Sequence, residues 1–116
     1  MRFTIKMVGQ VLRVVNSDRK RFLLTLTEYR VFVEWLTYAP DYHPTTVQIG
    51  QQLQVAQSHV STAFRSLVKK EVLQRVGKGD VGQSMYQLHD TVALIAGLKV
   101  PLEKDPNRYK GLKDNS

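Results

Sequence analysis

A run of polar side chains within residues 57–70 has the composition of a surface that contacts the bases of a nucleic acid. Most of its members are short and uncharged, unlike the alternating glutamate and lysine of a merely solvated helix face. They are Gln57, Ser58, Ser61, Thr62 and Arg65. A glutamine amide can pair with adenine through two hydrogen bonds, and an arginine guanidinium can pair with guanine in the same way. The segment is therefore a candidate for reading base edges in the major groove of duplex DNA.

The same segment has the apolar spacing of an amphipathic helix. Its apolar residues recur every three or four positions, as one buried helix face requires; they are Val60, Ala63, Phe64, Leu67 and Val68. This spacing predicts a helix over residues 57–70 whose other face is polar. Most of the polar candidates lie in its first half, the part of a recognition helix that reaches base edges.

Duplex DNA also needs contacts to its phosphates, and the chain offers three groups of basic side chains for them. The candidates are His59 and Lys69 on the predicted helix, Arg75 and Lys78 beside a predicted hairpin, and the cluster Arg19, Lys20 and Arg21. Simpler explanations stay open. His59 and Lys78 can be solvated side chains, and Lys69 can serve only the dipole at the helix C-terminus.

The distribution of charge singles out the basic cluster. The chain of 116 residues has a formal net charge of +7, which suggests a polyanionic partner. Residues 1–24 carry +5, residues 25–90 carry zero, and residues 91–116 carry +2. We therefore expect residues 19–21 to touch phosphates rather than bases; the alternative is a surplus that serves solubility alone.

The elements that must position these residues are predicted by capping and periodicity. Thr25 with Glu28, and Thr45 with Gln48, have the spacing of capping boxes that open helices over residues 24–38 and from residue 45. Residues 72–76 and 83–88 are typical of strands around a glycine-rich turn. Asp90 is expected to cap a last helix over residues 91–99.

Two helices joined by a short turn and followed by a hairpin predict a winged helix-turn-helix. The fold class is then α+β and mainly helical, with a three-helix core and a hairpin wing over residues 77–83. Gly50 is expected where the second and third helices approach closely, Val55 fills the turn, and Val60 anchors the third helix.

The two ends of the chain are less well determined by pattern. Phe3, Ile5 and Met7 alternate as in a strand, whereas Ile5, Val8, Leu12 and Val15 suit a helix. The β-branched content and Gly9 favour strands. We predict residues 1–23 as a basic and apolar N-terminal segment, residues 24–99 as the winged helix-turn-helix domain with its C-terminal helix, and residues 100–116 as a flexible tail. At least one of the apolar segments 1–15 and 91–99 is expected to build a two-fold dimer interface; the alternative is that both pack on the chain's own core.

Other classes of protein have little support. The absence of cysteine rules out disulfides and thiolate metal sites. His43, His59 and His89 are too scattered to suggest a metal centre, and there is no phosphate loop, nucleophile elbow or carboxylate pair. We expect no enzyme activity, no cofactor and no metal. Charges interrupt the N-terminus too often for a signal peptide, and no apolar run would span a membrane, so the expected location is cytoplasmic.

Residues 24–90 resemble the MarR-type winged-helix proteins. Residues 24–32 (LTLTEYRVF) are similar to their first helix, residues 49–55 (IGQQLQV) to their second helix and turn, and residues 60–73 (VSTAFRSLVKKEVL) to their recognition helix and the start of the wing. Gln54 stands at the usual glycine of the turn, Ala56 at the usual serine cap, and Glu71 at a common helix-ending glycine. The small winged-helix replication and partition proteins of plasmids and phages are equally similar.

These resemblances imply a sequence-specific double-stranded DNA-binding protein that acts as a homodimer. A transcriptional regulator bound to an inverted repeat is the first interpretation, with any small-molecule effector unknown. A replication or partition protein that binds repeated sites on a mobile element is the alternative. A winged helix that binds a protein partner is a third, which the polar face of residues 57–70 opposes because protein interfaces need apolar anchors.

A footprint on DNA from the protein's own locus separates the first two interpretations. We expect one protected site with two-fold symmetry, because a dimer of helix-turn-helix subunits matches two half-sites. Protection of a tandem array of sites would indicate a centromere or origin instead.

Overall fold

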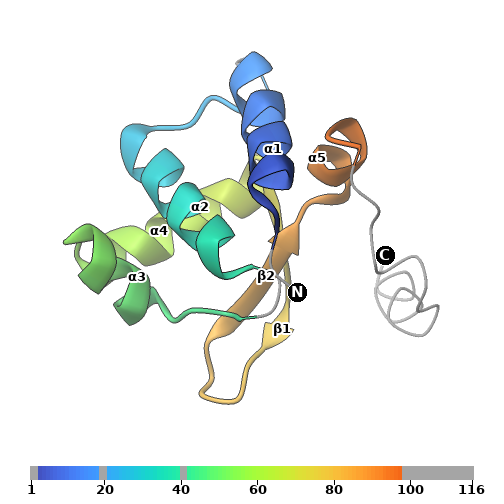
Figure 1. The fold of residues 1–116 in the computed structure, drawn as a ribbon. Coiled ribbons are helices and arrows are strands. Elements are labelled where there is room, and N and C mark those ends of the chain that lie inside the picture. The colour runs from blue at the N-terminus through green and yellow to red at the C-terminus, as the bar shows by residue number, and fades with distance from the viewer. Residues whose placement is uncertain (1–2, 19–20, 40–41, 98–116) are drawn as a thin grey trace.

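The computed structural model describes residues 3–18, 21–39 and 42–97. Three helices form its centre: α2 (Leu26–Tyr38), α3 (Thr46–Leu53) and α4 (Gln57–Lys69). They contact one another pairwise, and α2 crosses α4 (Figure 1). Both predicted capping boxes are present, at Thr25 with Glu28 and at Thr45 with Gln48. Helix α4 begins after Ala56 without a side-chain cap, as its sequence predicts.

The conformation of Gln54 and the absence of a side chain at Gly50 make the turn between α3 and α4 tight. Gln54 adopts the left-handed conformation, with φ 57° and ψ 47°, at the position where glycine is usual. The Val55 N–H donates to the Gly50 carbonyl at 2.9 Å. A Cβ on Gly50 would lie 2.6 Å from the Val55 carbonyl oxygen but 3.7 Å from Val60. The requirement for glycine therefore comes from the backbone of the turn rather than from the facing helix.

An antiparallel hairpin follows α4 and projects away from the helices (Figure 1). Its strands are β1 (Leu73–Lys78) and β2 (Ser84–Leu88). Leu73 pairs with Leu88 at the base, and the register shifts between Arg75 and Gly77, which marks a bulge at Val76. Strand β1 ends at Lys78, two residues closer to the turn than the end of the predicted strand over residues 72–76.

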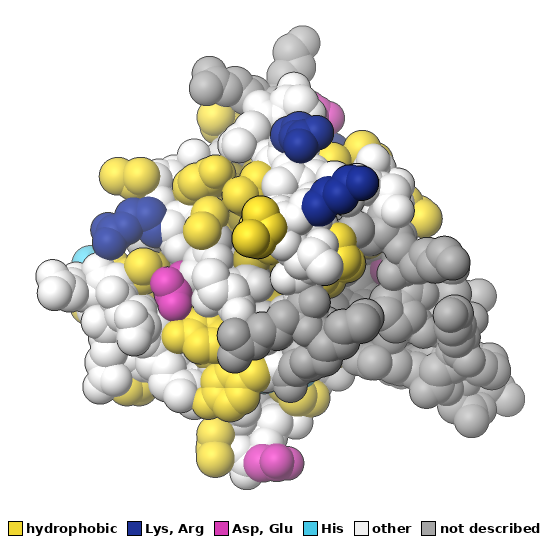
Figure 2. Space-filling model, in the orientation of Figure 1, with side chains coloured by type: hydrophobic (Ala, Val, Ile, Leu, Met, Phe, Trp, Pro, Cys, Tyr) yellow, Lys and Arg dark blue, Asp and Glu magenta, His cyan; other side chains and the backbone are white. Residues whose placement is uncertain are grey.

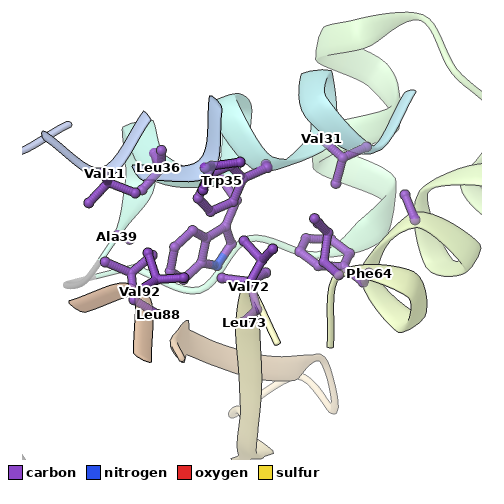
Figure 3. Packing of buried hydrophobic residues seen from close by; sticks show 14 of the residues in the cluster. Val11, Val31, Trp35, Leu36, Ala39, Phe64, Val72, Leu73, Leu88 and Val92 are labelled. Atoms are coloured by element: carbon purple, nitrogen blue, oxygen red, sulfur yellow. The ribbon is translucent and has the colours of Figure 1, made fainter. Parts of the chain in front are cut away.

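The core is assembled around Trp35 of α2. Trp35 is 2% exposed and stacks on Phe32 with ring centroids 6.3 Å apart. Figure 3 shows its indole between the helices and the base of the hairpin, close to Val72, Leu73 and Val92. The core therefore joins the helices to the hairpin directly.

The strands favoured for residues 1–15 are wrong. The segment forms helix α1 (Ile5–Ser17), whose first turn is capped by the Thr4 hydroxyl accepting from the Met7 N–H at 3.1 Å. Val11 and Val15, four residues apart, are buried in the core. Burial of one helical face outweighs the modest strand preference of β-branched residues, because that preference itself depends on packing.

The last helix ends at Ile95, earlier than predicted, and its predicted cap is wrong; residues 98 and 99 of the prediction lie outside the described residues. Helix α5 (Asp90–Ile95) is capped by His89, whose Nδ1 accepts from the Thr91 N–H at 3.3 Å. Gly97, with φ +75°, turns the backbone soon after. Helix α5 packs beside α1 (Figure 1). The expected tail, residues 100–116, lies outside the described residues.

The described chain is α+β and mainly helical, as predicted, with five helices and one two-stranded hairpin in these residues. None of the helices in the described ranges is both long and apolar enough to cross a membrane.

The C-terminal end of α4 is tied to the start of α2 by Lys70. Its Nζ donates to Glu28 Oε1 and to the Leu23 carbonyl, both at 2.6 Å. The same Glu28 oxygen accepts from the Thr25 N–H at 2.9 Å, so one carboxylate serves the helix cap and the ion pair. Burial alone would raise the pKa of Glu28, but hydrogen bonds from Lys70, Ser66 and the Thr25 backbone outweigh it and hold this pKa below its ordinary value.

Lys70→Met should lower the free energy of unfolding at pH 7 by about 1–3 kcal/mol, because it leaves a mostly buried carboxylate without its cation. Since the folded pKa of Glu28 is depressed, the stabilisation is present above the unfolded pKa and is lost as the pH falls through the folded value. The difference between parent and variant should therefore shrink as the pH drops below about 5. Urea unfolding between pH 7 and pH 3 measures both effects.

Lys69→Met is the matched control, since Lys69 is the exposed lysine next to Lys70, at the last position of α4. It should change the stability by less than about 0.5 kcal/mol. Equal losses from the two variants, or a difference that does not depend on pH, would contradict the role assigned to the Glu28–Lys70 pair.

Candidate nucleic-acid interface

A groove of about 530 Å³ lies between α4, the start of α3 and the hairpin. We call it the α4–hairpin groove. Its lining combines apolar side chains with polar ones that come from three separate elements. The polar and charged members are Thr45, Thr46, Gln57, Ser61, Arg65, Arg75, Gln83 and Ser84. Two of these are arginines and none is acidic, so the groove is an electropositive hollow.

Two stacked aromatic rings form one part of the groove lining. Phe64 of α4 and Tyr86 of β2 both line it, with ring centroids 4.6 Å apart and planes 2° from parallel. Phe64 is 2% exposed, so the stack continues into the core. This contact positions the hairpin against α4.

Four of the sequence-predicted residues meet in this groove: Gln57, Ser61, Arg65 and Arg75. The Gln57 amide donates to the Thr46 hydroxyl at 3.0 Å, which links the first turns of α4 and α3. The Arg75 guanidinium donates through Nε to the Ser84 hydroxyl at 3.2 Å, across the hairpin. Both side chains are thus held at the groove wall by partners from a neighbouring element.

A second set of predicted residues forms an exposed stripe along α4, at the helical spacing of four, three and four residues. Its members are Ser58, Thr62, Arg65 and Lys69, all exposed. The Thr62 hydroxyl donates to the Ser58 carbonyl at 2.9 Å and accepts from Arg65 Nη2 at 3.2 Å. Arg65 therefore belongs to both the stripe and the groove, and Thr62 orients it.

The other predicted contacts lie elsewhere. His59 is exposed on α4 and Lys78 is exposed at the end of β1, and neither lines the groove. Arg21 is exposed before α2, with its guanidinium carbon 5.5 Å from the centroid of the Phe22 ring. It is two residues from Leu23, which Lys70 holds at the far end of α4 from Gln57. Arg19 and Lys20 lie outside the described residues.

Several groove residues were not predicted from the sequence, because their proximity depends on long-range packing. Thr45 was assigned only to helix capping, and Thr46, Val81, Ser84 and Tyr86 were not singled out. Ser84 had one usable signal: an antiparallel hairpin brings the two ends of its turn together, and Arg75 lies on the opposite strand.

In the part of the chain that the structure describes, no three His, Cys, Asp or Glu side chains come together as a metal ion would require.

Compared with known proteins, the chain matches no protein-family model, no curated protein and no solved structure.

Proposed function

We propose that this chain is a winged helix-turn-helix protein that binds double-stranded DNA sequence-specifically, as a dimeric transcriptional regulator. Helices α2, α3 and α4 followed by the hairpin have the order of that fold, and the tight turn at Gln54 joins α3 to α4 as a helix-turn-helix requires. In this proposal α4 lies in the major groove, and the hairpin is the wing that reaches the flanking groove.

The observation that carries the proposal is the α4–hairpin groove itself. If α4 lies in the major groove of a duplex and the hairpin lies in the adjacent minor groove, one sugar–phosphate strand of that duplex must run between α4 and the hairpin. The α4–hairpin groove lies at that place, and it offers hydroxyl, amide and guanidinium groups with no carboxylate in its lining. Those are the side chains that contact phosphate oxygens in protein–DNA complexes.

The exposed stripe of α4 then supplies the contacts to bases. Ser58, Thr62 and Arg65 face outward beside the groove, and Arg65 is oriented by Thr62 before any ligand binds. A guanidinium pre-oriented along the helix loses less side-chain entropy when it pairs with a guanine edge. Phosphate contacts in the groove set the register, and the stripe supplies the sequence preference.

Arg65→Ala should weaken binding to a selected DNA site by about 1–3 kcal/mol and relax the preference at one or two base pairs. Thr62→Ala should have a smaller effect in the same direction, because Arg65 keeps its charge and loses only its orienting partner. Fluorescence anisotropy with a duplex enriched from a random library, and with a random duplex, measures both the affinity and the preference.

Arg13→Ala on α1 is the matched control, since it removes the same charge from an exposed helical position outside the groove. It should affect the selected and random duplexes alike. If both Arg65→Ala and Thr62→Ala bind the selected duplex as tightly as the parent, α4 does not lie in the major groove.

The proposed dimer rests on apolar side chains that the terminal helices leave exposed. Helices α1 and α5 bury Val11, Val15 and Val92 in the chain's own core. They nevertheless leave Ile5 93%, Leu94 62% and Ile95 59% exposed. We expect a second copy to cover these side chains of α1 and α5 with two-fold symmetry. The face shown in Figure 2 carries a separate gathering of apolar side chains over α2 and its junction with α1, which is the alternative place for an interface.

Replacing Leu94 and Ile95 together by Glu should abolish association at micromolar concentration, because charged residues are depleted from the core of an interface. Sedimentation velocity of parent and variant, with and without DNA, measures it. Leu26→Glu, at a residue 74% exposed on α2, is the control and should leave the dimer intact. A monomeric parent would disprove the dimer, and loss of association only in Leu26→Glu would move the interface to α2.

A further inference from the structure

The side chain of Gln83 connects the turn of the hairpin to the loop before α3. Its Nε2 donates to the His43 carbonyl at 3.1 Å, across forty residues of sequence. Its Oε1 accepts from the Val81 N–H at 3.1 Å, within the turn. The Gln83 carbonyl also accepts from the Gly79 N–H at 2.7 Å. Gln83 thus stabilises the turn through hydrogen bonds within it and also connects the turn to the loop before α3.

The other contacts of the hairpin do not by themselves determine where its turn lies. The stack of Phe64 on Tyr86 fixes the hairpin near its base, but the bulge at Val76 interrupts the pairing between that base and the turn. A bulge bends a strand and increases its local twist. The position of the turn relative to α4 is therefore not set by strand pairing alone.

Gly79 provides the space that the Gln83 amide occupies. A Cβ built on Gly79 would lie 2.5 Å from both Cδ and Oε1 of Gln83 and 2.6 Å from Nε2. No side chain larger than hydrogen fits there while Gln83 keeps this rotamer. Gly79 has no positive φ, so alanine would not strain its backbone.

We propose that Gln83 is a positioning residue, a latch that holds the hairpin turn at the distance from α4 at which one sugar–phosphate strand fits the α4–hairpin groove. This inference rests on the proposed DNA-binding function and names what the groove accepts. Gln83 itself lines the groove, and the residues that the latch positions are its neighbours Val81 and Ser84, together with Arg75, which bonds to Ser84.

The test uses Gln83→Ala and Gly79→Ala in the full chain. The first removes the amide, and the second leaves Gln83 in place but displaces its amide from the turn. Binding is measured on a selected duplex and on a shortened one that keeps the base pairs under α4 but lacks the flank reached by the hairpin. Each variant should bind the long duplex about tenfold more weakly than the parent, which corresponds to about 1.4 kcal/mol.

On the shortened duplex, parent and variants should bind equally, because the hairpin then has no strand to hold. The double variant should be no weaker than either single one, since both changes break the same latch. Gln74→Ala is the matched control: Gln74 pairs with Gln87 near the base of the hairpin and does not line the groove. It should bind both duplexes like the parent.

A measurement without DNA tests the latch itself. The Val81 amide should exchange its hydrogen faster in both variants than in the parent, while amides of β1 stay unchanged. An unchanged Val81 exchange rate, or equal weakening on both duplexes, would overturn the positioning role. If the parent binds no duplex at all, the proposed function fails and the inference fails with it. If the parent binds and the variants match it on the long duplex, the inference alone fails.

Discussion

The backbone turn between α3 and α4 is the constraint on which the rest of the candidate interface depends. Its geometry requires a residue without a Cβ at Gly50, because the Val55 carbonyl approaches to 2.6 Å from where that atom would be. It also requires Gln54 in the left-handed region, at a cost of roughly 1–2 kcal/mol for a residue with a Cβ. In return, α4 starts directly beside the first turn of α3, where Gln57 meets Thr46.

Three contacts then hold α4 along its length. The turn positions its beginning, the stack of Phe64 on Tyr86 joins its middle to the hairpin, and Lys70 joins its end to Glu28 and Leu23. Because contacts at its two ends and on its buried face hold α4, the exposed stripe of Ser58, Thr62, Arg65 and Lys69 is not needed to keep the helix in place. That division explains how a helix without a side-chain cap can present an exposed polar face in a defined orientation.

The same arrangement separates the charges. At the C-terminal end of α4, Glu28 is paired with Lys70, and Glu71 lies 3.5 Å from His89. Glu28 is thus paired with a cation, and both acidic groups lie at the opposite end of α4 from Gln57. Arg65 and Arg75 remain as the charges of the groove. A segment with zero net charge over residues 25–90 can thus present a locally positive surface to a polyanion.

The sequence by itself determined the features that depend on spacing within one short segment: both capping boxes, the buried stripe of α4 and the missing side-chain cap at Ala56. Such signals are local, so pattern alone is enough to predict them. Tertiary packing decided the rest. Residues 5–17 fit two periods, and burial of Val11 and Val15 selected the helix. The meeting of Thr46, Arg65 and Arg75 in one groove depends on how α3, α4 and the hairpin dock, which no short stretch of sequence encodes.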